Sequence, residues 1–177
     1  MKGPTFSKNL FECIPPEGSE KHFQLLEFCK HNHSHVLATM PFIASEVAEF
    51  CGFYAFFELI REFGGSKINL AGGPGKLLER YGLFLSEKSY EKLMFHTECD
   101  WIDLPSAWGV FIALRRAAIM GEVKKARVPT VKGPVLNRTL AQKYGVSERY
   151  IRKLTKIQPQ GTPPQPPSKA GGTMPRD

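Results

Sequence analysis

Long apolar runs are missing from this sequence of 177 residues. No stretch of about 18 or more apolar residues occurs, so the sequence predicts no membrane-spanning helix. The opening residues, MKGPTFSKNLFECIPPEG, also lack the apolar centre and small-residue cleavage site of a secretory signal. We therefore expect a soluble cytoplasmic protein, and the composition, 42% apolar and 23% charged, is that of an ordinary globular chain.

Cysteine is scarce, and its positions show no pairing pattern. Because no C-x-x-C pair occurs, we expect reduced thiols and no disulfide bridges. The four cysteines are Cys13, Cys29, Cys51 and Cys99. The segment CKHNHSHV places His31, His33 and His35 beside one of them, and thiolate and imidazole are suitable zinc or nickel ligands. No second ligand pair at zinc-finger spacing follows, so a solvated turn at a helix end is favoured and a metal site is the alternative.

Catalytic patterns are also missing. The segment GGPGK at residues 72–76 resembles a phosphate-binding loop, but such a loop needs glycine at position 70 and serine or threonine at position 77. Leu70 and Leu77 stand there instead. No Ser/His/Asp or Cys/His arrangement stands out either. The sequence therefore predicts neither an enzyme nor a bound cofactor.

Acidic residues are rare in one region. Residues 111–157 hold twelve lysines and arginines against Glu122 and Glu148, which gives a local charge of +10. The whole chain carries +7, so the remainder sums to −3. A segregated basic region suits a polyanionic partner, because neutralising phosphates releases counterions and supplies much of the affinity. A solvated basic surface without a ligand is the alternative.

Helical periodicity is abundant and predicts a mainly α fold. Apolar residues recur at helical spacing over about 21–31, 42–63 and 106–122. The glycine pair Gly64-Gly65 is expected to end the second of these helices.

The two ends of the chain differ from this pattern. Residues 1–20 contain prolines and glycines without a period, and we expect an irregular N-terminal arm there. Residues 158–177 contain six prolines in twenty residues, and we expect a disordered tail.

Two helix-then-strand units are expected between residues 56 and 105. The alternation in SKINLAGG, with Ile68 and Leu70 beside polar residues, is typical of a short strand. A shift of 34 residues aligns FFELIREFGGSKINLA with YEKLMFHTECDWIDLP, so that Ile68 falls on Ile102 and Leu70 on Leu104. Chance similarity between two amphipathic segments is the alternative.

The segment NRTLAQKYGVSERYIRKL, residues 137–154, predicts a helix-turn-helix. Ala141 is small where two helices cross closely, Gly145 suits a tight turn, and Ile151 is placed to pack back onto the first helix. Ser147 is a natural N-cap for the second helix. The expected core consists of Leu140, Ala141, Tyr144, Val146, Tyr150 or Ile151, and Leu154.

The polar residues of this segment are candidates for contact with double-stranded DNA. With the core assigned, Arg149 and Arg152 are left outward, where each has the chemistry to bind a guanine edge with two hydrogen bonds. Lys153 and Lys156 are expected to contact phosphate. The full set of candidate DNA-binding residues is Arg138, Thr139, Ser147, Glu148, Arg149, Arg152, Lys153 and Lys156. An ordinary basic helical hairpin is the alternative.

The motifs GGSKINLA, WIDLP, ALRRAAI and LAQKYGVSERYIRKL together resemble the Mor transcription activator family of Mu-like phages, which includes the Mor and C activators. The resemblance covers about residues 40–157. The run Tyr144–Ser147 is similar to the family's Tyr-Gly-Leu-Ser turn, and Ile102–Pro105 is similar to its strand and proline. Two departures are Glu98-Cys99 in place of a second glycine pair and Arg115-Arg116 in place of Arg-Asn.

The resemblance implies a phage or prophage activator acting as a homodimer in the cytoplasm of a bacterial host cell. Residues 21–122 would form a helical dimerisation body with short β-strands, and residues 123–157 the helix-turn-helix. It also implies recruitment of bacterial RNA polymerase through its α and σ subunits. A repressor with the same DNA-binding module is one alternative. A phage protein-interaction factor that inhibits a host nucleic-acid-binding complex is another.

Overall fold

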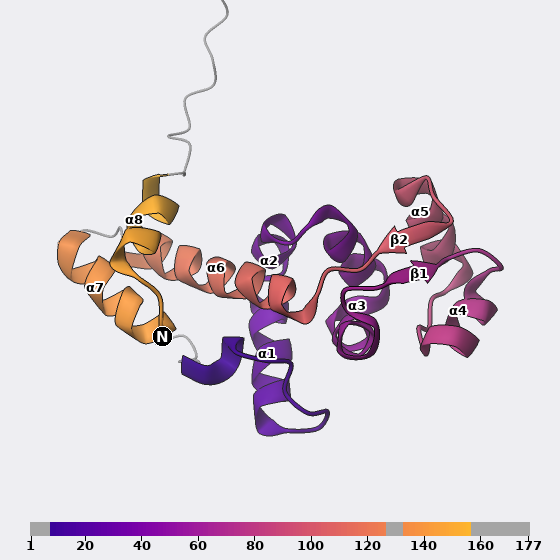
Figure 1. Ribbon diagram of the computed structural model, residues 1–177, viewed down its shortest axis with the longest axis horizontal. Helices are drawn as coiled ribbons and strands as arrows, with labels where there is room; N and C mark the ends of the chain where they lie inside the picture. The colour runs from indigo at the N-terminus through magenta and orange to yellow at the C-terminus, as the bar shows by residue number, and fades with distance from the viewer. Residues whose placement is uncertain (1–7, 127–132, 157–177) are drawn as a thin grey trace, which may run out of the picture.

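The computed structural model describes residues 8–126 and 133–156 and is mainly α-helical, with one two-stranded sheet (Figure 1). Among the described residues, no helix has the length and apolar character needed to cross a membrane. The elements are a 3-10 helix η1 (Lys8–Phe11), α1 (Glu20–His31), α2 (His33–Thr39), α3 (Phe42–Phe63), β1 (Lys67–Asn69), α4 (Pro74–Tyr81), α5 (Glu87–Thr97), β2 (Trp101–Asp103), α6 (Ala107–Ala126), α7 (Gly133–Tyr144) and α8 (Glu148–Lys156).

The main core lies where α1, α2 and α3 meet the first half of α6. Aromatic side chains fill much of it: Phe56 and Phe57 of α3 and Phe111 of α6 are almost fully buried. Leu25 of α1 and Val36 of α2 are buried in the same cluster. Burial of side chains of this size stabilises the fold by about 1.5–3 kcal/mol each.

The helix predicted over residues 42–63 is confirmed, with one interruption. Gly52 takes φ +81° and ψ 157°, which breaks the regular helical backbone within α3. Glycine adopts positive φ without the steric cost that a Cβ would bring. The apolar period continues on both sides of Gly52, so periodicity alone predicted one continuous helix. The helix ends at Phe63, directly before Gly64-Gly65 as expected.

The two helix-then-strand units are present. β1 follows α3 and β2 follows α5, and the two strands pair antiparallel with Ile68 opposite Ile102. Both isoleucines are buried, as are Leu70 and Leu104. The two isoleucines that a shift of 34 residues aligns in the sequence are therefore also partners in the antiparallel sheet.

Part of the predicted N-terminal arm, residues 8–19, packs against the body, and within it only η1 is regular. Leu10 and Phe11 of η1 are buried in the main core. Arg115 Nη2 donates to the Phe11 carbonyl at 2.8 Å, and Arg61 Nη2 donates to the Pro15 carbonyl at 2.7 Å. Leu10 and Phe11 are a single apolar pair, which is too short to show a helical or strand period. The local sequence therefore gives no indication of their contacts with distant residues.

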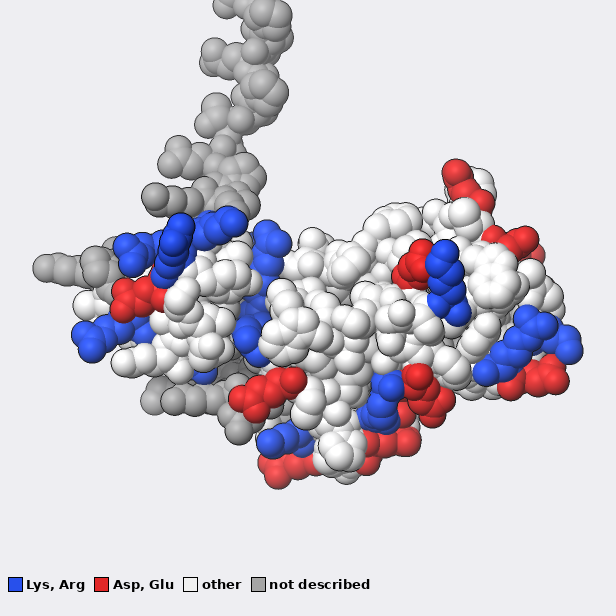
Figure 2. Space-filling view, in the orientation of Figure 1, with Lys and Arg blue, Asp and Glu red and all other residues white. Residues whose placement is uncertain are grey.

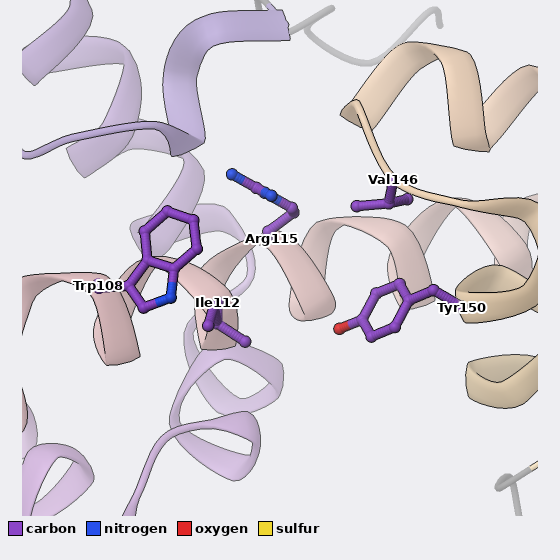
Figure 3. Close-up of a pocket in the computed structure, with 5 residues that line it drawn as sticks. All are labelled: Trp108, Ile112, Arg115, Val146 and Tyr150. Atoms are coloured by element: carbon purple, nitrogen blue, oxygen red, sulfur yellow. The ribbon is translucent and has the colours of Figure 1, made fainter.

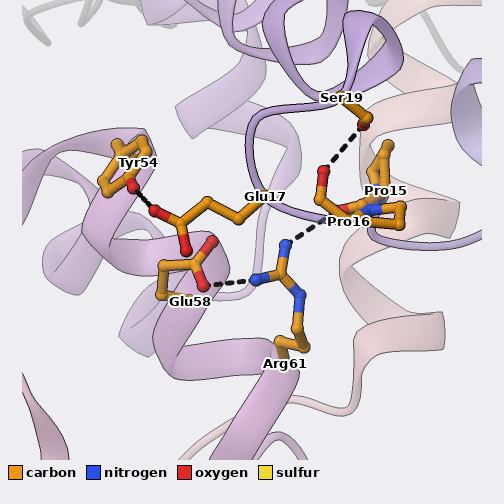
Figure 4. A network of polar contacts seen from close by, with 7 residues as sticks. All are labelled: Pro15, Pro16, Glu17, Ser19, Tyr54, Glu58 and Arg61. Carbon is orange, nitrogen blue, oxygen red and sulfur yellow. Dashed lines mark hydrogen bonds and ion pairs between the residues drawn. The ribbon is translucent and has the colours of Figure 1, made fainter.

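A polar network fastens the loop before α1 to α3 (Figure 4). Tyr54 donates a hydrogen bond to Glu17, and Arg61 is paired with Glu58. The Ser19 hydroxyl donates to the Pro16 carbonyl at 2.7 Å and accepts from the backbone of α1, where Ser19 is the N-cap. The loop is therefore held by side chains rather than by strand pairing.

Two short helices were not predicted. α2 begins at His33, where a solvated turn was favoured, and α4 begins at Pro74 within the GGPGK segment. Proline is common at the first helical position, because its missing N–H would be unpaired there in any case. Helices of seven or eight residues show too little periodicity to be distinguished from turns. The Pro-rich tail predicted at 158–177 lies outside the described residues.

Candidate nucleic-acid interface

Three helices build one end of the molecule around a small second core. The second half of α6 packs against α7 and α8 (Figure 1). The buried members of this core are Ile119, Val123, Leu140, Ala141, Ile151 and Leu154. Three further predicted members are partly buried at its edge: Tyr144, Val146 and Tyr150. Because α6 contributes residues on both sides of position 122, the boundary expected there falls inside a continuous helix.

The turn between α7 and α8 has the predicted geometry. Gly145 takes φ +63°, a left-handed conformation that glycine adopts readily. The Val146 N–H donates to the Ala141 carbonyl at 3.0 Å, which closes the end of α7. Ser147 Oγ accepts from the Tyr150 N–H at 3.2 Å, as expected of an N-cap. These bonds fix the angle at which α8 leaves α7.

Glu122 of α6 joins the helix-turn-helix to the rest of the chain. Its Oε1 accepts hydrogen bonds from Tyr144 Oη at 2.7 Å and from Lys143 Nζ at 2.5 Å. Burial, followed by the bond to Glu122, raises the pKa of Tyr144 above its ordinary value, so the phenol remains a donor. Sequence reasoning missed this contact. The signal was the scarcity of acidic residues in the basic region, which makes Glu122 conspicuous.

The outward face of α8 carries a row of three cations. Arg149, Arg152 and Lys153 follow i, i+3, i+4 spacing, so they lie on one helical face, and all three are exposed. None has an ion-pair partner among the described residues. Glu148 is exposed in the first turn, where a negative charge is favourable to the helix dipole.

Positive charge gathers at this end of the molecule. Figure 2 shows lysine and arginine side chains clustered over the end formed by α7 and α8, whereas both signs are mixed over the remainder of the visible face. The lysines and arginines visible at this end therefore lie together on one surface, as binding to a polyanion requires.

The remaining predicted residues divide into three groups. Arg138 and Thr139 are exposed on α7, and the Thr139 hydroxyl donates to the Val135 carbonyl at 2.9 Å. Ser147 is exposed, but its hydroxyl oxygen serves as the N-cap of α8. Lys156 is the final residue of α8, and its side chain lies outside the described part.

The histidine segment brings its rings to different partners. His31 Nδ1 lies 3.2 Å from Glu27 Oε1, and His33 Nε2 lies 3.4 Å from Glu49 Oε2. His35 Nε2 lies 3.1 Å from the Ala117 carbonyl oxygen of α6. Over residues 8–126 and 133–156, no three His, Cys, Asp or Glu side chains are grouped as a metal site would require.

No protein-family model matches this chain, and neither a curated protein nor a solved structure is significantly similar to it. The functional argument therefore depends on how α6, α7 and α8 are arranged and on the charges that they expose.

Proposed function

We propose that this protein is a sequence-specific DNA-binding regulator of transcription that uses α8 as its recognition helix. The observation that carries the proposal is the row of exposed cations Arg149, Arg152 and Lys153 on a helix whose opposite face is anchored by Ile151 and Leu154. A helix of this kind fits the major groove, where arginine binds guanine O6 and N7 with two hydrogen bonds.

The surrounding residues are suited to the DNA backbone. In a helix-turn-helix the first helix crosses the phosphates, so exposed Arg138 and Thr139 of α7 are available there. Lys153 is the backbone contact on α8, and Lys156 extends the row by its spacing in the sequence. These contacts position the protein on the duplex, and the two arginines specify the bases.

Dimerisation, activation and the host are proposals that the resemblance to the Mor family supports. On that basis the protein is a phage or prophage activator, active as a homodimer in a bacterial cytoplasm and recruiting RNA polymerase through its α and σ subunits. Large apolar side chains exposed on the body favour a second copy: Phe42, Phe95 and Trp101 are 59%, 80% and 57% exposed. Light scattering tests this: twice the 19.9 kDa chain mass is expected, and the mass of one chain contradicts it.

Selection from a pool of random duplexes tests sequence-specific binding. The full chain, retained on a support, is expected to enrich a defined sequence over successive rounds. A related pseudo-palindromic half-site pair would agree with a dimer. Retention of duplexes without any enriched sequence would contradict specific binding. That result would favour the protein-interaction factor, whose basic surface competes for nucleic acid.

The sign of regulation needs a separate measurement. A reporter gene placed downstream of the enriched sequence is expected to increase in expression when the protein is produced. A decrease would identify a repressor with the same DNA-binding module and would leave the assignment of α8 unchanged.

A further inference from the structure

An unfilled apolar groove lies where α6 meets the turn between α7 and α8 (Figure 3). Its volume is about 210 Å³, and its lining is mainly apolar. The lining residues are Trp108, Ile112, Arg115, Val146 and Tyr150. Trp108 is 58% exposed and Ile112 is 42% exposed, although both lie beside a well-packed core. An exposed tryptophan next to a groove indicates a surface that a ligand covers.

The polar atoms of the groove are hydrogen-bond donors. Figure 3 shows the Trp108 and Tyr150 rings on either side of Ile112, with the indole nitrogen and the hydroxyl turned toward the space between them. Neither group has a hydrogen-bond partner within the described part of the chain. The Arg115 guanidinium lies 5.8 Å from the Trp108 ring centroid and, like the indole, has donors but no acceptor, whereas the Tyr150 hydroxyl has both.

This chemistry fits a proline-rich strand. A polyproline II helix presents apolar rings and free carbonyl oxygens, and its prolines have no N–H groups to satisfy. Aromatic-lined grooves bind such strands by packing against the proline rings, while indole and phenol groups donate to the carbonyls. A cationic or donor-rich ligand would leave its own donors without acceptors against this lining.

We propose that the segment Pro163–Pro167 of this chain, with the sequence PPQPP, binds in the groove as a polyproline II strand. Tyr150 precedes the end of α8 by six residues, which is about 9 Å along the helix axis. The six residues 157–162 span up to about 20 Å when extended. The segment therefore reaches the groove of its own chain, where tethering gives an effective concentration on the order of millimolar.

Fluorescence of Trp108 tests the proposal in the full chain. The second tryptophan is removed by Trp101→Phe, and acrylamide quenching is measured with the native tail and with the four prolines 163, 164, 166 and 167 changed to alanine. Loss of the prolines is expected to raise the quenching constant on the order of two-fold, because a bound strand covers the indole. Equal quenching in the two chains would overturn the proposal.

Matched variants locate the binding site. Ile112→Asp puts a charge inside the groove and is expected to abolish the tail-dependent protection of Trp108. Val135→Asp adds the same charge at a 60% exposed position of α7 and is expected to preserve it. If Ile112→Asp fails to fold by circular dichroism, Tyr150→Phe removes the hydroxyl donor alone and is expected to weaken the protection.

Two outcomes separate this proposal from others. Protection that is the same with Ile112→Asp or Tyr150→Phe as in the parent chain would place the tail elsewhere and overturn the proposed site. Protection that grows with protein concentration would show docking between chains and overturn binding within one chain. Since the assay contains no DNA, its result is independent of the regulatory function proposed above.

Discussion

The two halves of α6 belong to two cores, which differ in size and in the net charge of the residues around them. Its first half contributes Val110, Phe111 and Leu114 to the large aromatic core, and its second half contributes Ile119 and Val123 to the small core under α7 and α8. Residues 111–157, which include the small core, carry a net charge of +10, whereas the remainder of the chain sums to −3.

Ion pairing differs in the same way. On the body, Lys76 Nζ lies 2.9 Å from Glu79 Oε2, and Lys67 lies across the sheet from Asp103 at 3.8 Å. On α8, three neighbouring cations have no such partner among the described residues. Like charges this close destabilise a short helix slightly. Their gathering is therefore better explained by an anionic ligand than by the stability of the fold.

The two cores are expected to differ most in the regions that lose protection when a buried side chain of the small core is truncated. Ile151 is fully buried in a core with few other members, so Ile151→Ala is expected to cost about 2–5 kcal/mol. Hydrogen exchange should speed up in α7 and α8, while α1 and α3 keep their protection. Val135→Ala, at an exposed position of α7, is the control and should change stability by less than about 0.5 kcal/mol. Equal loss of protection in α3 would show that the two cores unfold together.

A smaller loss of stability is expected when the contact between α6 and α7 at Glu122 is removed. Glu122→Gln removes the carboxylate that accepts from Tyr144 and Lys143, and it should destabilise α7 by about 1–2 kcal/mol, because both bonds are partly exposed. The other acidic residue of the basic region, Glu148, supplies the control. Glu148→Gln removes a carboxylate that has no side-chain hydrogen bond or ion pair within the described residues, and it should cost less than about 0.5 kcal/mol in urea unfolding. Similar midpoints for both variants would show that the Glu122 contacts contribute nothing specific.

The smallest effect concerns the charge of α8 itself. If Lys153 contacts phosphate, Lys153→Ala should flatten the dependence of log affinity on log salt concentration by about one unit per bound chain. Lys88→Ala removes an exposed lysine from α5, at the opposite end, and should leave the slope unchanged. Random duplex DNA is the probe, since a phosphate contact does not depend on sequence. A slope that responds equally to both variants would mean that the whole protein attracts DNA without a defined surface.

Much of the fold follows from local patterns. The helical period of residues 42–63, the alternation around Ile68 and the spacing from Leu140 to Leu154 predicted α3, the strands and the helix-turn-helix, because each pattern is repeated over several residues. The packing of Leu10 and Phe11 was not predictable, since their partners in the core and the Arg115 donor to the Phe11 carbonyl are distant in the sequence. Short α2 and α4 lacked enough turns to show a period.

The candidate interface was predictable to a similar extent. Once Ile151 and Leu154 were assigned to the core, helical geometry left Arg149, Arg152 and Lys153 outward, and the structure has them exposed. The contribution of α6 was not foreseen. Its period is continuous through both cores, so the sequence does not reveal that one half of the helix serves the body and the other half serves the helix-turn-helix.

The affinity of α8 variants for two duplexes tests the proposed recognition helix most directly. The duplexes are the sequence enriched by selection and a scrambled version of it. Arg149→Ala and Arg152→Ala are each expected to lose about 1–3 kcal/mol on the enriched duplex and little on the scrambled one, while Lys88→Ala changes neither. If both arginine variants lose the same affinity on both duplexes, α8 is a basic surface that does not contact base edges, and its assignment as the recognition helix is wrong.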